Sequence, residues 1–578
     1  MIANKSFRLR HGVKRCLSVI NGPAFTPKEW TTDQLLMRAV EKMPDCKQAI
    51  FDLFATEFTY QETHEVAEKF AAGLLAAGLK PGDKVAVWGP NQPEWYIMKW
   101  ATAKVVSLNP LYTVPELEYA MNKVGAKALV CPKELGPLNY HAALTSLIPD
   151  LDSQDKFNIK SSALPDLKTV IYYTCYEEVG GVIRWDELEE MGSDKNVTEV
   201  RSIKVDPYSN SNIQFTSGTT GRPKAAGLSH YGLVNNAISV SANANKYANL
   251  TVPGESKILN CLPLYHVFSY LGGSMWGAHS FQTNVYPTPG FNADAALNSI
   301  AEHKCTSILG TPTMMVDIVN SPIVKDLDIR IGLQWAVLGG SPVSKVLVKR
   351  AKETIGCDVT IVYGMTENSG GTFQTPMGKP DATDVLETVG EAYQGVQAKI
   401  LDKDGNTVPK GTIGELCTKG YFVFNGYIND EEKTKESFTE DGFFKTGDLA
   451  MLREDGMIKI TGREKDLIIR GGENIQPTEI EDFINEMPEV LDCYVIGVPS
   501  SRLGEEVAAY IQLKDDSVTK EDITAFCKDG LARYKLPKYI KFTEEFPKTV
   551  TGKIQKYLLR DQAMEDFPEL KKELAAMQ

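Results

Sequence analysis

The chain has 578 residues, more than one hydrophobic core usually supports, so two or more domains are expected. Hydrophobic residues make up 43% of it and charged residues 24%, as in an ordinary soluble globular protein. The formal net charge of -13 argues against a nucleic-acid partner, because phosphate backbones favour a basic surface.

The ten cysteines lie far apart and form no CxxC pair and no Cys/His cluster, which disfavours a zinc site or a disulfide framework. Reduced thiols in a cytosol-like or matrix compartment are the simpler expectation. No apolar run reaches the roughly 18 residues that a membrane span needs, so a soluble protein without a transmembrane segment is expected. The sequence leaves the oligomeric state open.

The N-terminal segment is basic and carries no acidic side chain before Glu29. Arg8, Lys14 and Arg15, with apolar residues at positions 7, 17 and 20, fit a basic amphipathic helix of the kind found in mitochondrial presequences. We predict a presequence over residues 1–28 and a location in the mitochondrial matrix. The alternative is a disordered basic tail, with the cytoplasm as the second choice of location.

From about Trp30 to Arg463, short β-branched runs alternate with longer helical stretches. Buried strands are predicted at Lys84–Gly89, Lys127–Cys131, Lys168–Tyr173 and Thr306–Thr311, and helices at Glu62–Ala77 and Val114–Val124. This alternation predicts an α/β fold with mostly parallel sheets covered by helices. The polar segments Asp150–Leu164 and Met191–Ile203 are expected to be surface loops.

The pattern changes near Gly462, where GREKDLIIRGGENI forms a charged, glycine-rich junction. Beyond it we predict helices at Pro477–Asn485 and Lys520–Leu531, and strands at Asp492–Val498 and Glu506–Leu513. A mixed α+β unit of about 110 residues is long enough to fold on its own. We therefore predict an N-terminal domain over residues 29–464 and a C-terminal domain over residues 465–578.

The segment TSGTTGRPK follows the predicted strand Ser211–Phe215. Glycines and small residues after a strand let the backbone turn tightly and point N–H groups at an anion, while the lysine adds a positive charge. The segment does not fit the Walker A pattern. It predicts a cradle for a polyphosphate, and the alternative is a Gly/Ser/Thr-rich hairpin without a ligand.

TSGTTGRPK resembles the phosphate loop of the adenylate-forming superfamily, which contains acyl-CoA synthetases, luciferases and peptide-synthetase adenylation domains. The segments YGMTE, TGD, GREKD, GGENI and TGK follow in the family's order, so the resemblance covers the chain after the leader. Within this superfamily, the chain most resembles the mitochondrial medium-chain acyl-CoA ligases, and this closer match lies in NIQFTSGTTGRPK, YGMTEN, DLIIRGGENI and GKIQK. The resemblance implies a large α/β N-terminal domain with a small β-rich subdomain, and a small mobile α+β C-terminal domain.

The resemblance also implies an ATP/AMP site. Its residues would be Thr216, Ser217, Gly218, Thr219, Thr220, Gly221, Arg222, Pro223, Lys224, Gly339, Gly340, Ser341, Tyr363, Gly364, Thr366, Asp448, Arg463 and Lys553. Catalytic roles fall to Lys553, Lys224, Thr366, Glu367 and His266.

Individual roles follow partly from chemistry and partly from the family. Glu367 is a carboxylate beside bound phosphates, which suits Mg²⁺. Asp448 would accept the ribose hydroxyls and Arg463 would make a second ribose or phosphate contact. The cation of Lys553 would stabilise charge developing between carboxylate and phosphate. The ring of Tyr363 would stack on adenine.

Further positions would serve the other substrates. His266 resembles the gate beside the acyl carboxylate, and Phe268, Thr311 and Gly339 would border the acyl tunnel. Gly471 and Gly472 would line the passage through which CoA enters. Lys465 would be the hinge about which the small domain swings.

The expected reaction is therefore the ATP-dependent conversion of a fatty acid, medium-chain by the closer match, to its adenylate and then to acyl-CoA, with Mg²⁺ as cofactor and CoA as substrate. The alternatives are an aryl-acid or 4-coumarate-type CoA ligase, a luciferase-like oxygenase, or a silent binding protein with the same fold. A P-loop kinase is disfavoured by the missing Walker A loop. Two departures from the family stand out: Ala225 replaces the usual glycine, and Lys99–Pro110 is a short helix–strand passage.

Overall fold

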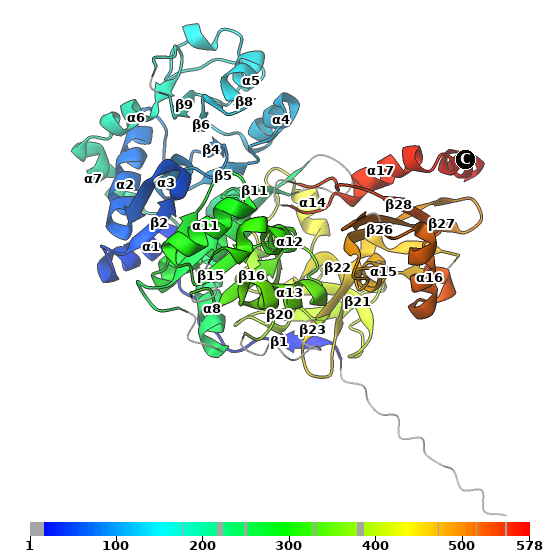
Figure 1. Cartoon of the computed structure of the whole chain (residues 1–578). Coiled ribbons are helices and arrows are strands. Elements are labelled where there is room, and N and C mark those ends of the chain that lie inside the picture. Colours follow the sequence, from blue (N-terminus) through cyan, green and yellow to red (C-terminus); the bar gives the residue numbers. More distant parts are fainter. Residues whose placement is uncertain are drawn as a thin grey trace, which may run out of the picture.

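The computed structural model describes residues 17–175, 177–216, 223–247, 251–327, 329, 332–377, 387–471, 473–515, 517–549 and 552–577. Three sheets and their helices form the chain up to Arg463, and a further sheet with its own helices follows (Figure 1). In Figure 1 this last part, orange to red, lies on one side of the larger body.

The first large sheet has seven strands, of which only the last pair is antiparallel. In sheet order they are β10 (Ile183–Arg184), β9 (Thr169–Tyr173), β6 (Ala128–Pro132), β4 (Val85–Trp88), β5 (Val105–Leu108), β11 (Asn210–Thr216) and β12 (Lys224–Ser229). The central strands are buried on both faces, as parallel strands between helices must be.

The second large sheet has nine strands, parallel at its centre and antiparallel at its edges. In order they are β19 (Glu391–Ala392), β18 (Gly370–Gln374), β17 (Asp358–Met365), β16 (Trp335–Gly339), β15 (Ser307–Gly310), β13 (Lys257–Asn260), β14 (Thr283–Tyr286), β2 (Lys47–Phe51) and β3 (Thr56–Thr59). A short hairpin, β7 (Glu134–Leu135) and β8 (Leu138–Asn139), lies outside both sheets.

The two large sheets and their helices form a layered body. One apolar core lies between the sheets and is filled by helices that include α1, α2, α3 and α8. Helices α4 and α5 cover the outer face of the seven-stranded sheet, and α11, α12 and α13 that of the nine-stranded sheet. The helices are α1 (Thr32–Lys42), α2 (Tyr60–Ala76), α3 (Pro93–Ala101), α4 (Val114–Val124), α5 (Tyr140–Leu147), α6 (Trp185–Met191), α7 (Asp194–Ser202), α8 (His230–Tyr247), α9 (Val267–Ser269), α10 (Trp276–Ser280), α11 (Ala293–His303), α12 (Pro312–Asn320), α13 (Lys345–Ile355) and α14 (Glu431–Glu436).

The third sheet is antiparallel and makes the β-rich subdomain. Its strands are β1 (Val19–Asn21), β20 (Gln397–Leu401), β21 (Ile413–Lys419), β22 (Phe444–Leu452) and β23 (Ile458–Arg463). The predicted presequence, residues 1–28, overlaps this sheet, because β1 pairs with β20 and the Gly22 amide donates to Val396 O at 2.7 Å. Ser18 is fully buried. The basic residues at 8, 14 and 15 lie outside the described residues.

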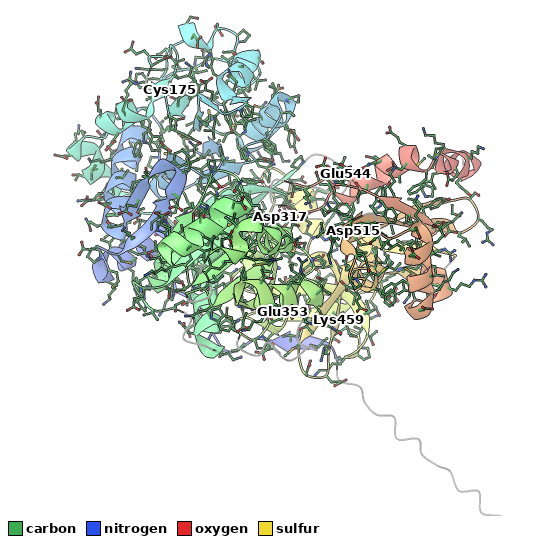
Figure 2. The ribbon with its side chains drawn as sticks, in the orientation of Figure 1. Cys175, Asp317, Glu353, Lys459, Asp515 and Glu544 are labelled. Carbon is green, nitrogen blue, oxygen red and sulfur yellow. The ribbon has the colours of Figure 1, made fainter. Side chains whose placement is uncertain are left out.

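The C-terminal part is built on a sheet of β25 (Glu473–Ile475), β24 (Ile468–Arg470), β27 (Gly504–Leu513), β26 (Val490–Ser500) and β28 (Tyr539–Phe542). Helices α15 (Pro477–Ile484), α16 (Lys520–Gly530), α17 (Lys556–Asp566) and α18 (Glu569–Met577) pack on it. Figure 2 labels Asp317 of α12 and Lys459 of β23 on the side of the larger body that faces this part. Burial raises the pKa of Asp317, and the charge of nearby Lys548 opposes this shift.

The predicted fold class is confirmed: two mostly parallel sheets covered by helices, a β-rich subdomain and an α+β C-terminal part. The prediction that Met191–Ile203 is a loop is wrong, because α7 spans most of it. Ser193 caps this helix by accepting from the Asn196 amide, and Arg201 pairs with Glu68 of α2. None of its side chains is fully buried and most are polar, so its apolar signal in the sequence is weak.

Among the described residues, no helix combines the length and apolar character needed to cross a bilayer. The short passage after Lys99 is accommodated by three residues between α3 and β5, and β5 pairs on both sides in regular register.

Candidate active site

A cavity of about 2390 Å³ lies between the larger body and the C-terminal part. Its walls carry most of the described residues that the sequence marks out, from strands, loops and helices far apart in the chain. They include Thr216, Pro223, Lys224, His266, Phe268, Thr311, Gly340, Ser341, Tyr363, Gly364, Thr366, Glu367, Asp448, Arg463, Lys465 and Lys553.

The predicted phosphate loop joins β11 to β12, and Thr216 pairs across the hairpin with Lys224. Ser217, Gly218, Thr219, Thr220, Gly221 and Arg222 lie outside the described residues. The carbonyl of Pro223 accepts from the Tyr119 hydroxyl of α4 at 3.1 Å. Ala225 lies in β12, buried, and its φ is not positive, so alanine fits where relatives carry glycine.

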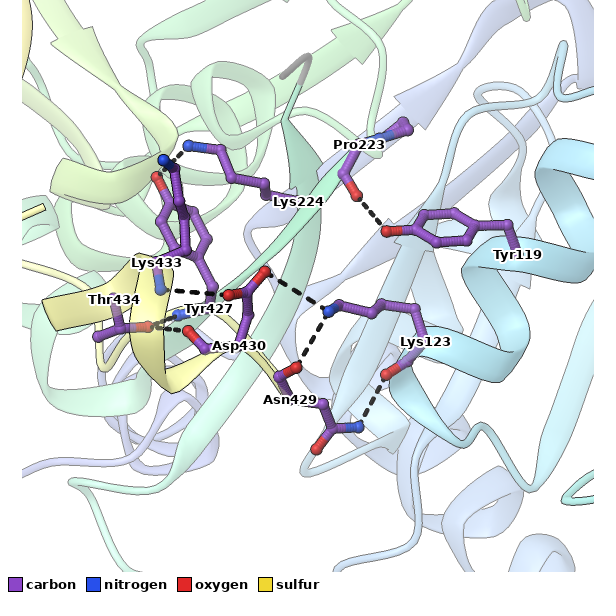
Figure 3. Close-up of polar contacts among 9 residues, drawn as sticks. All are labelled: Tyr119, Lys123, Pro223, Lys224, Tyr427, Asn429, Asp430, Lys433 and Thr434. Atoms are coloured by element: carbon purple, nitrogen blue, oxygen red, sulfur yellow. Dashed lines mark hydrogen bonds and ion pairs between the residues drawn. The ribbon is translucent and has the colours of Figure 1, made fainter. Parts of the chain in front are cut away.

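Lys224 and Glu367 meet through a residue that sequence reasoning missed, Tyr427 (Figure 3 draws Lys224 and Tyr427). The Lys224 ammonium donates to the Tyr427 hydroxyl at 3.0 Å, and that hydroxyl donates to Glu367 Oε1 at 2.9 Å. Thr216 also donates to Glu367 Oε1, at 3.3 Å. Burial lowers the pKa of Lys224, and the charge of Glu367 opposes this shift.

Glu367 is a carboxylate of the cavity wall that could hold the predicted Mg²⁺. It is 5% exposed and sits in a short turn, Thr366–Asn368, after β17. The described residues contain no group of three or more His, Cys, Asp or Glu side chains able to hold a metal. One carboxylate beside a phosphate cradle suits Mg²⁺, which usually takes one or two carboxylates plus substrate phosphates. The donor set therefore fits the predicted ion.

Asp448 links the neighbouring strands β22 and β23 to β17. Asp448 of β22 lies opposite Arg463 of β23, and the Arg463 Nε donates to its Oδ1 at 2.8 Å. The Tyr363 hydroxyl donates to Oδ2 at 2.6 Å. The charge of Asp448 raises the pKa of Arg463, and burial raises that of Tyr363. These three side chains form one wall of the cavity.

Glycines allow the backbone of the neighbouring loops to come close. A β-carbon on Gly364 would lie 1.7 Å from Gly370 O, and one on Gly339 would lie 2.6 Å from Val362 O. Gly340 has a φ of 86° and turns the chain after β16. Gly340 and Ser341 line the cavity, as Tyr363 does, whereas Gly339 is not part of its wall.

Lys553 reaches this wall from the C-terminal part. The charge of Arg463, followed by burial, lowers the pKa of Lys553 to about 8. His266 caps α9, and burial together with the nearby Lys553 charge lowers its pKa to about 4, so its ring is neutral near pH 7. Thr313 of α12 donates to Gly552 O at 3.1 Å and holds the Lys553 loop against the larger body.

An apolar branch of the cavity follows His266. The residues from Tyr270 to Met275 form a π-helical turn between α9 and α10. Phe268, Leu271, Gly272 and Trp276 line the branch, with Thr311 at the start of α12. Wide turns of this kind are common at functional sites.

The predicted hinge and the predicted CoA passage differ in their relation to this cavity. Lys465 lines it in the turn between β23 and β24, where burial lowers its pKa. Gly471 follows β24 with a φ of 59°, and its amide donates to Leu503 O at 2.7 Å, but it is not part of the cavity wall. Gly472 lies outside the described residues.

Comparison with known proteins agrees with this arrangement. Residues 36–428 match the AMP-binding enzyme family, and residues 479–553 match the AMP-binding enzyme C-terminal domain. The medium-chain acyl-CoA ligase ACSF2, mitochondrial, of Danio rerio is 40% identical over 563 residues, 94% of this chain and 90% of the relative. The putative acyl-CoA synthetase YngI of Bacillus subtilis (strain 168) is 36% identical over 548 residues, 93% of this chain and 98% of the relative.

A solved structure is also similar. The ATP-bound crystal structure of MatB from Rhodopseudomonas palustris superposes with a TM-score of 0.75 at 28% identity, covering 93% of this chain and 100% of that one. The resemblance inferred from the motifs is thus confirmed, since the family match spans most of the chain and extends into its C-terminal part. The chain belongs to the AMP-binding enzyme family.

Proposed function

We propose that this protein is an ATP-dependent acyl-CoA ligase that acts on a fatty acid, with medium-chain acids as its preferred substrates. One observation supports the proposal above all: five predicted site residues line the same cavity, which also has an apolar branch. They are Lys224, Glu367, Asp448, Arg463 and Lys553. The relatives named acyl-CoA ligase or synthetase support the reaction type.

In the first step, a carboxylate oxygen attacks the α-phosphorus of ATP, and the bond to the leaving pyrophosphate breaks. Lys224 holds the polyphosphate, Asp448 and Arg463 orient the ribose, and the Lys553 ammonium stabilises the charge that develops at the α-phosphate. Neutral His266 lies beside Lys553, where it can border the carboxylate without adding charge. Mg²⁺, when bound at Glu367, would neutralise phosphate charge.

In the second step, the CoA thiolate attacks the acyl carbonyl, and the bond between that carbon and the AMP oxygen breaks. Lys553 occupies the wall where the reacting groups meet, so the C-terminal part has to turn before the thiol can enter. We place the hinge at Lys465, in the turn after β23, and the CoA passage along Gly471 and Gly472.

We further propose a mitochondrial location, which the names of the ACSF2 relatives support and the bacterial YngI relative does not require. Because β1 pairs with β20 of the β-rich subdomain and the Lys28 amide donates to Asn235 Oδ1 of α8, we propose that a leader, if it is removed, ends before Leu17. Import of the full chain into isolated mitochondria, followed by N-terminal sequencing of the product, tests this. A product that begins at Glu29 would contradict it.

The decisive experiment for function is a panel of acids incubated with ATP, Mg²⁺ and CoA, with AMP release as the readout. Highest turnover on medium-chain fatty acids, of roughly six to twelve carbons, supports the proposal. Preference for aryl acids supports the alternative. Absence of pyrophosphate exchange with every acid would favour a silent binding protein. Lys553→Ala should lose adenylate formation far more than thioester formation from supplied adenylate, and equal loss of both would contradict the role of Lys553.

A further inference from the structure

Tyr427 belongs to a segment that is added to the edge of β12 beside the phosphate loop. The Asn425 amide donates to Gly227 O at 2.9 Å, and the Ile428 amide donates to Ala225 O at 2.8 Å. These bonds fix the segment next to the strand that begins with Lys224. The Tyr427 side chain is 6% exposed, and its ring packs against Phe424 at 4.8 Å between centroids.

The Tyr427 hydroxyl separates a cation from an anion. It accepts a hydrogen bond from Lys224 at 3.0 Å and donates one to Glu367 Oε1 at 2.9 Å. The Lys224 ammonium also lies 4.3 Å from the centroid of the Tyr427 ring. Within the part of the chain that the structure describes, Lys224 and Glu367 form no direct ion pair, so the phenol bridges them.

The chemistry of this bridge suits a spacer. A tyrosine hydroxyl, whose ordinary pKa is about 10, is neutral at neutral pH. A neutral phenol can accept from a cation and donate to an anion at the same time, without adding charge to the site.

A second network anchors the same segment (Figure 3). The Tyr427 amide donates to Thr434 Oγ1 at 2.8 Å, and Thr434 donates to Asp430 O at 2.8 Å. Lys123 of α4 donates to Asn429 O at 3.0 Å and lies 3.6 Å from Asp430 Oδ2. Helix α4 also holds Pro223 through Tyr119, so one helix contacts both the end of the phosphate loop and the Tyr427 segment.

We propose that Tyr427 is a positioning residue that sets the separation of the Lys224 ammonium and the Glu367 carboxylate before ATP and Mg²⁺ arrive. This rests on the proposed function, which gives those two groups to phosphate and metal. Without the hydroxyl, the ammonium and the carboxylate are free to pair directly, and nucleotide binding has to break that pair. With it, both groups meet the ligand already apart.

The test compares Tyr427→Phe with a matched control, Tyr421→Phe. Tyr421 is also largely buried, and its hydroxyl donates to Ser239 Oγ at 2.7 Å, away from Lys224 and Glu367. ATP affinity is measured by calorimetry with Mg²⁺ and again with EDTA, and unfolding is measured without nucleotide. Tyr427→Phe should bind ATP roughly 10- to 100-fold more weakly with Mg²⁺, while Tyr421→Phe binds as the wild type does.

A double-mutant cycle separates positioning from a general structural effect. In a Glu367→Gln background the pair no longer exists, so Tyr427→Phe should add less than about threefold to the loss of affinity. An equal loss in both backgrounds would overturn the proposal, as would wild-type affinity in Tyr427→Phe. Because these are binding measurements, they stand even if no acid in the panel is turned over, so the failure of the proposed function would be seen separately.

Discussion

Lys99 is the most unusual charged residue in the core, and replacing it should stabilise the protein. Its side chain is 1% exposed in α3, and its ammonium has no hydrogen-bond partner among the described residues. The rings of Tyr96, Trp100 and Tyr270 surround it, with centroids at 4.4, 5.2 and 4.9 Å. Burial lowers its pKa well below the ordinary value for lysine.

The expected gain from Lys99→Met follows from these contacts. Replacing a buried ion pair by apolar residues of similar volume is often stabilising by about 1–4 kcal/mol, and Lys99 has no ion pair among the described residues to repay its burial. The aromatic cage offsets part of the burial cost, by about 2 kcal/mol when the cation is desolvated. Methionine keeps the length of the side chain and adapts to irregular space. We therefore expect the free energy of unfolding to rise by about 1–4 kcal/mol at pH 7.

The gain in stability from Lys99→Met should depend on pH. Since the folded protein binds the Lys99 proton more weakly than the unfolded chain, wild-type stability rises with pH between the lowered pKa and the ordinary value of 10.5. The variant lacks this contribution, so its advantage should be larger at pH 6 than at pH 9. Urea unfolding of both proteins at several pH values measures it, with the exposed Lys80→Met as control. A destabilised variant, or an advantage that does not shrink as pH rises, would refute the reasoning.

Three further predictions concern the site and the N-terminal segment. The pKa of Lys553, about 8 in the free protein, predicts that kcat/KM for ATP in pyrophosphate exchange falls as pH rises through 8, and that Lys553→Arg lacks this fall; a shared alkaline limb would contradict it. Gly272→Val should abolish turnover of the longer acids while short acids still react, because a β-carbon there already lies 3.1 Å from Leu309. The control is Gly290→Val, at an exposed position where a β-carbon has nothing within 4 Å. An unchanged chain-length profile would count against the assigned acyl branch. A protein that begins at Glu29 should unfold at lower urea than one that begins at Leu17, by roughly 2–4 kcal/mol for the lost strand and its hydrogen bonds, and equal stability would show that β1 contributes nothing.

The predicted buried strands were found because parallel strands covered on both faces read as continuous apolar runs. Lys84–Gly89 and Lys168–Tyr173 contain β4 and β9, whose side chains are all buried. Helix α7 lies on the surface, is mostly polar and has no fully buried side chain, so its cap at Ser193 is the clearest sign of it in the sequence. Strand β1 has three residues, and its partner β20 lies more than 370 residues further along the chain.

The candidate site likewise contains residues that the sequence marked and one that it did not. The motifs marked Lys224, Glu367 and Asp448 because each stands in a recognisable run of neighbours. Tyr427 stands 60 residues from Glu367 and 203 from Lys224, so no local spacing connects it to either. Only the pairing of its segment with β12 brings them together, and that pairing is a tertiary contact.

The arrangement around Asp448 has a consequence for nucleotide recognition. A carboxylate offers about four lone-pair positions. Among the described residues, Arg463 and Tyr363 each occupy one of these positions, on different oxygens. Two of the four positions remain, and a ribose has two adjacent hydroxyl groups. A sugar lacking one of the two would leave an acceptor of this nearly buried carboxylate empty. If Asp448 binds the ribose as proposed, deoxynucleotides are therefore expected to bind more weakly than ribonucleotides.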